Sequence, residues 1–473
     1  MNPINLLYVD LFCGAGGTST GVNTARLGGA QCARVIACVN HDAKAIASHA
    51  ANHPDALHFT EDIRTLELSP LVAHVNRSRA EHPEARVALW ASLECTNFSR
   101  AKGGQPRDAD SRTLAEHLFR YIEALNPDYI QIENVEEFRS WGALDANGRP
   151  VSKDRGRSYV RWVNKVKSYG YDYDCRIMNA ADYGAYTSRK RFFGIFARKG
   201  LPIAFPEQTH SRRGDAGLFG ILPKWRPVRE VLDFDDEGES IFGRKKPLAE
   251  NTLKRIYAGL IKFVAGGSDA FLVKYNSMSR NGRYVPPSLD APCPVVATQS
   301  RLARASVHFL SKQYGGAPAD KNIPVDGAVT TNPKHHLVTV RRHYLMNPQF
   351  ASAGSSVDAP CFTLIARMDK RPPFLVTTEH GGIAVEIYDT DSPMTVKIKE
   401  FMALYCIVDI KMRMFKISEL KLITGFPEDY ILIGTQADQK KFIGNAVEVT
   451  IARKWCEALC QALSENGKQT KAA

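Results

Sequence analysis

The sequence of 473 residues predicts an α/β protein, in which a mostly parallel sheet with helices on both faces is joined to a smaller β-rich domain. Two observations lead to this prediction. Over residues 1–205, short apolar runs alternate with longer helical patterns, as in βαβ units. After Pro202, proline, glycine and basic residues become frequent, and short β-like runs replace the alternation. We therefore expect one domain over 1–205, a second over 206–405, and a C-terminal segment over 406–473 that returns to the first.

Four apolar runs are expected to form strands of the sheet, at residues 6–12, 33–39, 87–93 and 129–133. Helices are expected to begin near Thr18, Ala43 and Ser111, and the serine is a typical N-cap residue. Helical periodicity over residues 443–463 predicts one helix in the C-terminal segment. In the second domain, acidic turns followed by β-branched runs predict repeated strands at 289–298, 325–331, 357–366 and 389–398.

The charge of the chain favours a polyanionic partner. Lysine and arginine outnumber aspartate and glutamate by 62 to 50, which gives a net charge of +12. Such a balance favours phosphate contacts with nucleic acid, although basic proteins also carry charge for solubility alone. The ten cysteines form no CxxC pair and have no histidine partners at zinc-like spacing, so no metal site is expected. No membrane segment is expected either, and we predict a cytoplasmic protein with free thiols.

A glycine-rich turn follows the first predicted strand and precedes a helix. It runs from Asp10 through Phe12, Gly14 and Gly16 to Gly17, and such a turn lets the backbone approach a ligand at a helix N-terminus. Turns of this kind also bind dinucleotides or serve only as tight turns. Because the dinucleotide pattern GxGxxG is absent, a cofactor without a pyrophosphate is favoured.

Polar residues end the next two segments of the predicted sheet. Asn40 and His41 follow the second strand, where a polar side chain could hydrogen-bond ribose hydroxyls. Further along, Glu61 and Asp62 precede Ile63 and offer a carboxylate to an adenine amino group. Asparagine and aspartate are also common as helix caps and turn residues, so this structural alternative stays open.

The candidate reacting centre lies after the strand expected at 87–93. Cys95 follows that strand directly, at the edge where open α/β sheets bind their ligands, although most single cysteines are inert packing residues. Glu133 ends the next strand at the same edge and offers a carboxyl group for proton sharing. Arg189 and Arg191 precede another strand on one face, where they could hold a base carbonyl or a phosphate, or be solvated charges of an edge strand.

In their order along the chain, these segments resemble the DNA cytosine-5 methyltransferase family. The matching stretches are DLFCGAGG, NHD with the following NHP, EDI, the loop that contains Cys95, ENV, SRKR, GFPEDY and IGNAV. The resemblance covers nearly all of the chain except the middle of the β-rich region. It implies an S-adenosylmethionine-dependent, Rossmann-like methyltransferase sheet with a target-recognition domain that binds the major groove of double-stranded DNA.

The resemblance also implies roles for individual residues. Cys95 would add to carbon 6 of a flipped cytosine, Glu133 would stabilise the base at N3, and Arg191 would orient it, while Arg189 would hold the loop. The implied cofactor-binding residues are Asp10, Phe12, Gly14, Gly16, Gly17, Asn40, His41, Asp62, Ile63, Asn445 and Ala446.

Five positions depart from the family pattern. Glu94-Cys95-Thr96 stands where the family usually has Pro-Cys-Gln, and the charge of Glu94 beside the thiol keeps open methylation of an exocyclic amine, cytosine N4 or adenine N6. Asn40, Thr187 and Glu448 replace a glutamate, a glutamine and a proline. A relative that binds DNA without turnover is a further alternative. Neither the recognition sequence nor the oligomeric state follows from the sequence.

Overall fold

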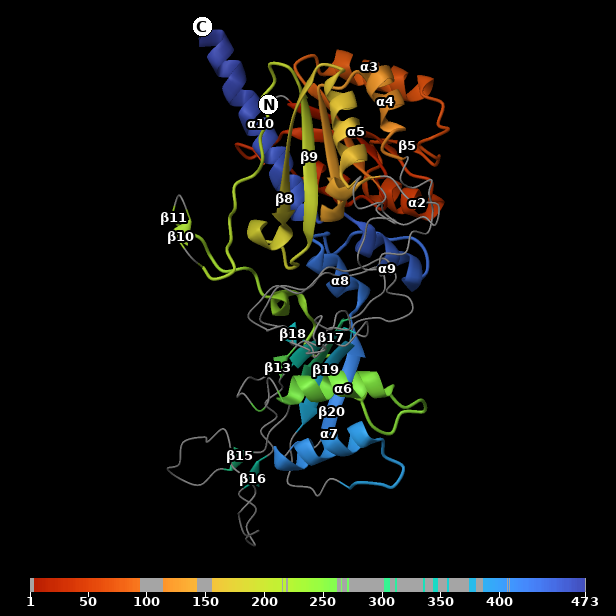
Figure 1. Cartoon of the computed structure of the whole chain (residues 1–473), viewed down its shortest axis with the longest axis vertical. Coiled ribbons are helices and arrows are strands. Elements are labelled where there is room, and N and C mark those ends of the chain that lie inside the picture. Colours follow the sequence, from red (N-terminus) through yellow and green to blue (C-terminus); the bar gives the residue numbers. More distant parts are fainter. Residues whose placement is uncertain are drawn as a thin grey trace. The chain divides into compact units, whose positions relative to one another are not determined.

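The chain forms two compact units, described by a computed structural model (Figure 1). Unit 1 comprises Met1–Ala185, Arg189–His210 and Thr424–Ala473, and unit 2 comprises Tyr186–Ser188 and Ser211–Ile423. The structure describes residues 4–93, 114–142, 155–214, 216–217, 220–261, 265, 270–271, 302–306, 311–312, 335–336, 343–347, 355–356, 374–379, 386–405, 407 and 409–472.

A seven-stranded sheet lies in the middle of unit 1, in the order β5-β4-β1-β6-β7-β9-β8. The first five of these strands are parallel, whereas β9 is antiparallel to both of its neighbours. Because β4 and β6 flank β1 on opposite sides, the strand order reverses at β1, and open α/β sheets bind ligands beyond the carboxyl ends of strands at such a point. The strands are β1 Leu6–Leu11, β4 Ala33–Val39, β5 Leu57–Phe59, β6 Arg86–Ser92, β7 Tyr129–Asn134, β8 Tyr171–Asn179 and β9 Lys190–Arg198.

Helices cover both faces of this sheet, which confirms the predicted fold class. Alternation along β1 sends Leu7 and Val9 to one face, where they pack in a core with α3, α4 and α5. Leu6 and Tyr8 point to the other face and pack in a core with α1 and α10. The helices are α1 Gly17–Asn23, α2 Ala43–Asn52, α3 Ser69–Glu81, α4 Leu118–Leu125, α5 Arg157–Lys167, α9 Gln436–Asn445 and α10 Val449–Ala472. Among the described helices, none has both the length and the apolar composition needed to cross a membrane.

The single helix expected over 443–463 is wrong, because the chain leaves the helical path between α9 and α10. Ala446 has φ −58° and ψ 144°, and this extended step brings Val447 against the start of α1. Glu448 then accepts a hydrogen bond of 2.8 Å from the Ile451 amide through Oε2, which satisfies an N–H group of the first turn of α10.

Unit 2 contains a second sheet in the order β12-β20-β19-β17-β14-β13. Its strands include β12 Glu239–Ser240, β13 Ala270–Phe271, β14 Leu302–Ser306, β17 His343–Asn347, β19 Phe374–Glu379 and β20 Asp409–Met414, with helices α6 Glu250–Gly259, α7 Pro393–Leu404 and α8 Ile417–Ile423. Residues 409–423 lie in unit 2 and not in the returning segment, because β20 is antiparallel to β19 and bonded to it along its whole length. The strand expected at 389–398 is a helix from Pro393, capped by the Ser392 hydroxyl. The other three repeats lie outside the described residues.

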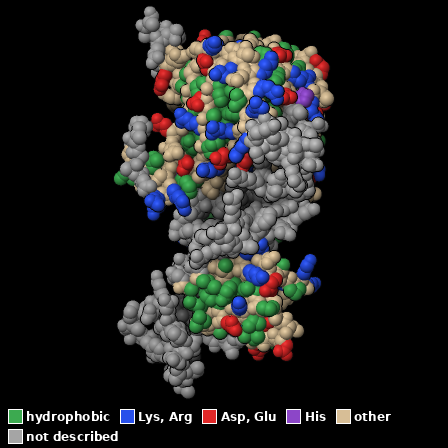
Figure 2. Space-filling model, in the orientation of Figure 1, with side chains coloured by type: hydrophobic (Ala, Val, Ile, Leu, Met, Phe, Trp, Pro, Cys, Tyr) green, Lys and Arg blue, Asp and Glu red, His purple; other side chains and the backbone are tan. Residues whose placement is uncertain are grey.

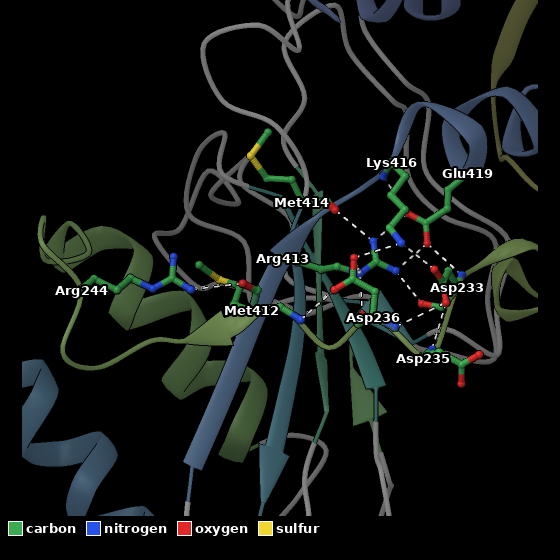
Figure 3. Close-up of polar contacts among 10 residues, drawn as sticks. Asp233, Asp235, Asp236, Arg244, Met412, Arg413, Met414, Lys416 and Glu419 are labelled. Carbon is green, nitrogen blue, oxygen red and sulfur yellow. Dashed lines mark hydrogen bonds and ion pairs between the residues drawn. The ribbon is translucent and has the colours of Figure 1, made fainter.

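A buried ion pair joins β20 to α8 within unit 2 (Figure 3). Arg413 and Glu419 are 8% and 2% exposed, and Arg413 donates to both carboxylate oxygens at 2.9 and 2.7 Å. Arg413 also donates to the carbonyl oxygens of Asp233 and Asp236. Lys416 pairs with the carboxylates of the same two aspartates, at 2.6 and 3.0 Å. This cluster therefore fixes the segment at 233–236 against the end of β20.

Candidate active site

The glycine-rich turn after β1 has a left-handed backbone at several positions. The φ values of Phe12, Gly14 and Gly16 are 59°, 54° and 99°. Glycine adopts this conformation readily, whereas for Phe12 it costs about 1–2 kcal/mol. A strained residue of this kind at the carboxyl end of a central strand is typical of a ligand site.

The three glycines of the turn have different surroundings. A Cβ atom on Gly14 would meet no atom within 4 Å, so the turn borders open space there. On Gly16, a Cβ atom would overlap the Tyr430 hydroxyl, and on Gly17 it would lie 2.5 Å from the Val447 carbonyl oxygen and 3.0 Å from the Ala446 Cβ. Gly16 and Gly17 are therefore needed for packing, and the returning C-terminal segment lies against the turn.

Asp10 is fully buried at the end of β1. Its Oδ2 accepts a hydrogen bond of 2.8 Å from the Ser19 hydroxyl. Burial raises the pKa of the Asp10 carboxyl group well above its usual range, because desolvation outweighs the hydrogen bond from Ser19. Asp10 thus links the end of β1 to Ser19 of α1, on the two sides of the glycine-rich turn.

The polar residues after β4 hold the start of α2. Asn40 is half-buried, and its Oδ1 accepts from the Asp42 amide at 2.9 Å, while His41 is exposed. Asp42 caps α2 through the amides of Lys44 and Ala45. The turn role that the sequence left open for Asn40 is therefore present in the structure.

Asp62 and Ile63 follow β5. The Asp62 carboxylate accepts from the Arg64 backbone amide at 2.9 Å and forms a 2.6 Å ion pair with the Arg64 guanidinium. The hydrogen bond from the Arg64 side chain lowers the pKa of Asp62. Ile63 is buried, and its carbonyl oxygen accepts from the Tyr121 hydroxyl at 2.9 Å. Asp62 is a turn acid, and its side chain is still one-third exposed, at 34%.

Glu133 and Arg191 meet at the carboxyl end of β7. Glu133 pairs in register with Phe193 of the antiparallel strand β9, and Arg191 lies two residues from Phe193 on the same face. The Arg191 Nε is 3.3 Å from the Glu133 Oε1, and the two side chains are 15% and 9% exposed. A nearly buried carboxylate is thus held by a guanidinium whose planar fork can also bind a second acceptor.

Cys95 lies outside the described residues, as does its neighbour Glu94. The strand that leads to them is described: Ser92 of β6 pairs in register with Glu133, and Asn134 donates to the Leu93 carbonyl oxygen at 3.3 Å. The chain therefore enters the loop that contains Cys95 from a position beside Glu133.

Arg189 does not join Glu133. It is buried, at 7% exposed, and its Nη1 donates to the Gly444 carbonyl oxygen near the end of α9, at 3.2 Å. The next residue of α9, Asn445, is exposed. Arg189 thus connects the start of β9 to the returning C-terminal segment.

Sequence reasoning missed a group of buried polar side chains behind the glycine-rich turn. The Tyr430 hydroxyl donates to the Ala15 carbonyl oxygen at 2.6 Å and lies 3.3 Å from the His53 Nε2. Burial lowers the pKa of His53 to about 3. Tyr430 belongs to the GFPEDY segment and His53 to NHP, so these two motifs have a packing role that no local pattern indicates.

Comparison with known proteins places these features in one family. The chain matches the sequence model described as C-5 cytosine-specific DNA methylase over residues 6–218 and 350–471, which is more than half of its length. Both Glu133 and Arg191 lie within the first matched stretch, and the returning segment lies within the second.

Several curated proteins are similar to about half of the chain. The Type II methyltransferase M1.HphI of Haemophilus parahaemolyticus is 28% identical over 237 residues, which are 50% of this chain and 57% of that protein. M.AgeI of Thalassovita gelatinovora is 29% identical over 48% of this chain and 49% of its own length. The chain thus spans about half the length of these relatives.

Solved structures are similar over almost the whole chain. A mutant of DNMT2 from Spodoptera frugiperda is 14% identical, with a TM-score of 0.49 and coverage of 96% of this chain and 99% of that one. A putative prophage-encoded DNA modification methyltransferase of E. coli is 17% identical, with a TM-score of 0.46.

Proposed function

Because the chain belongs to the C-5 cytosine-specific DNA methylase family, we propose that it transfers a methyl group from S-adenosylmethionine to carbon 5 of a cytosine in double-stranded DNA. The observation that carries this proposal is the nearly buried pair of Glu133 and Arg191, beside the strand that leads to Cys95. A carboxyl group and a guanidinium in this position suit a base that must gain positive charge at N3 while it accepts electrons from a nucleophile.

The turn after β1 fits S-adenosylmethionine. Gly14 faces open space where a Cβ atom would lie, and Phe12 has a strained backbone at the carboxyl end of β1. S-adenosylmethionine supplies an electrophilic methyl group on a sulfonium ion. The residues that we propose to hold it are Asp10, Phe12, Gly14, Gly16, Gly17, Asn40, His41, Asp62, Ile63, Asn445 and Ala446. Asp10, Gly16 and Gly17 would shape the turn, and the backbone of the turn would contact the cofactor.

In the proposed reaction the Cys95 thiolate forms a bond to carbon 6 of a flipped cytosine. Ring electrons move to carbon 5, which would bond to the methyl group as the bond between that group and the sulfonium sulfur breaks, leaving S-adenosylhomocysteine as a neutral thioether. A base then removes the carbon 5 proton, and that electron pair restores the ring double bond as the thiolate leaves carbon 6. Glu133 hydrogen-bonds N3 throughout, Arg191 orients the base, and Arg189 positions β9 through Gly444.

We propose that unit 1 is the catalytic domain and that unit 2 is the target-recognition domain. The net charge of +12 supports phosphate contacts, and Figure 2 shows Lys and Arg side chains on the viewed face of unit 1. Residues 219–349, which the family model does not match, lie in unit 2, where a domain that varies with the recognition sequence would be expected. No disulfide joins the six cysteines Cys13, Cys32, Cys38, Cys175, Cys456 and Cys460, which supports a cytoplasmic location.

A trapping experiment tests the covalent step. DNA that contains 5-fluorocytosine has no carbon 5 proton to lose, so the chain and S-adenosylmethionine should form a stable adduct that maps to Cys95. Cys95→Ser should form no adduct, whereas Cys175→Ser, which changes a thiol of β8, should form it normally. The covalent mechanism would be overturned by a parent chain that forms no adduct with 5-fluorocytosine DNA but still methylates ordinary DNA.

The rival activity is methylation of an exocyclic amine, which the departure Glu94-Cys95-Thr96 keeps open. Amino methylation needs no covalent nucleophile, so Cys95→Ser would then keep its turnover. Glu94→Pro restores the usual residue before the cysteine, and under our proposal it should leave the methylated product unchanged.

A further inference from the structure

Two cysteines and a histidine converge beneath the glycine-rich turn, and a second histidine lies beside them. The sulfur atoms of Cys13 and Cys38 and a ring nitrogen of His49 all lie within 4.8 Å of one another, and all three residues are buried. The His49 Nδ1 is 3.6 Å from the Cys38 Sγ and 2.9 Å from the His58 Nε2. His58 also interacts with the Cys38 thiol.

These four residues come from four different elements. Cys13 lies in the turn after β1, Cys38 in β4, His49 in α2 and His58 in β5. Linear spacing therefore gives no sign of the cluster, because the cysteines and histidines come together only in three dimensions.

Two of the distances among these side chains are close to those around a tetrahedral metal ion. Zinc binds sulfur at about 2.3 Å and nitrogen at about 2.0 Å, so tetrahedral angles place sulfur about 3.5 Å from nitrogen and two nitrogens about 3.3 Å apart. The corresponding distances are 3.6 Å for Cys38 and His49 and 2.9 Å for the two histidines. His58 is half-buried and stands outside the group of three residues whose ligand atoms lie within 4.8 Å of one another, so its ring would have to turn toward Cys13 to complete the tetrahedron.

The hydrogen bonds behind His49 direct its lone pair into the cluster. Ser19 donates its hydroxyl proton to Asp10, so its oxygen accepts from the His49 Nε2, which is 2.8 Å away. The neutral ring then carries its proton on Nε2 and a lone pair on Nδ1, which faces Cys38 and His58. A metal-binding histidine usually has such an outer partner, which fixes its tautomer.

We propose that Cys13, Cys38, His49 and His58 bind one zinc ion. Two thiolates neutralise the charge of the dication, so the occupied site adds no net charge to this buried position. The ion joins the glycine-rich turn to β4, β5 and α2, and its role is to hold the turn in place. It does not take part in methyl transfer.

Metal analysis of the full chain, purified without chelator or affinity metal, tests this proposal. We expect one zinc per chain. After zinc removal, Co²⁺ should produce the strong visible bands of a tetrahedral site and a thiolate charge-transfer band in the near ultraviolet. A folded chain with only traces of zinc and no such Co²⁺ spectrum would overturn the proposal, and this result would leave the proposed methyl transfer untouched.

Variants identify the ligands. Cys38→Ala should abolish both the zinc and the charge-transfer band, whereas Cys460→Ala, which removes a buried thiol of α10, should keep them. Should Cys38→Ala fail to fold, His58→Gln changes a half-buried ligand and should weaken zinc binding. Ser19→Ala, which removes the outer hydrogen bond, should weaken it by about 10-fold to 100-fold. Unchanged zinc affinity in folded Cys38→Ala or His58→Gln would contradict the assignment.

Discussion

Glu448 should make the protein less stable as the pH rises, and Glu448→Gln should remove this dependence. The side chain is 1% exposed at the start of α10. Burial raises the pKa of this carboxyl group from 4.5 to about 7, because desolvation outweighs the hydrogen bonds from Ile451 and Thr450 and the charge of Arg453.

The sign and the size of the effect follow from this pKa. Below pH 4.5 the group is protonated in both the folded and the unfolded chain. Between pH 4.5 and 7 the unfolded chain releases its proton while the folded chain keeps it, so the free energy of unfolding falls as the pH rises. Above pH 7 both states are ionised, and the loss stays constant at about 3 kcal/mol, at about 1.36 kcal/mol for each pH unit. Glutamine does not titrate.

Urea unfolding of the parent chain and of Glu448→Gln, at pH 5 and pH 8, measures this difference. The advantage of the variant should grow by about 2–3 kcal/mol between the two values, whatever the pH-independent effect of the amide group is. Glu465→Gln, an exposed position of the same helix, should follow the parent within about 0.5 kcal/mol. Equal pH dependence in the parent and in Glu448→Gln would refute the reasoning.

Three further predictions test the site and the fold. Glu133→Gln should lower turnover by about 100-fold to 10,000-fold while DNA affinity in a gel-shift assay stays unchanged; equal losses of both would argue for a folding defect. Glu419→Ala should destabilise unit 2 by about 3–5 kcal/mol in urea unfolding, because Arg413 is left as a buried charge; a loss below about 1 kcal/mol would contradict this. Gly17→Ala should destabilise unit 1 by about 1–3 kcal/mol, because the new methyl group would overlap the Val447 backbone. Wild-type stability of this variant would contradict the close packing of Val447 on Gly17.

The sequence predicted those helices and strands whose signal lies in neighbouring residues. The strands at 33–39 and 129–133 and the start of α2 at Ala43 follow from apolar runs and a helix signal, and they agree with the structure. Local patterns failed where tertiary contacts decide. The break between α9 and α10 exists because Val447 packs on Gly17. The spacing of apolar residues along the chain does not reveal such a contact. Residues 393–398 contain β-branched residues but form a helix that Ser392 caps.

The candidate site was predicted as a set of residue types, and only in part as an arrangement. The sequence placed Glu133 and Arg191 near one edge of the sheet, but their ion pair depends on the register of β7 and β9. Arg189 was expected to hold the loop that contains Cys95, and its hydrogen bond to Gly444, more than two hundred residues away in the chain, could not be predicted from local sequence. The cluster around Cys38 was missed for the same physical reason, since its ligands come from separate elements.

Nucleoside mass spectrometry of DNA from cells that express the chain tests the central proposal most directly, with a Glu133→Gln strain as the matched control. We predict that 5-methylcytosine appears with the parent chain and is strongly reduced with the variant. N4-methylcytosine or N6-methyladenine without 5-methylcytosine would contradict the proposed function.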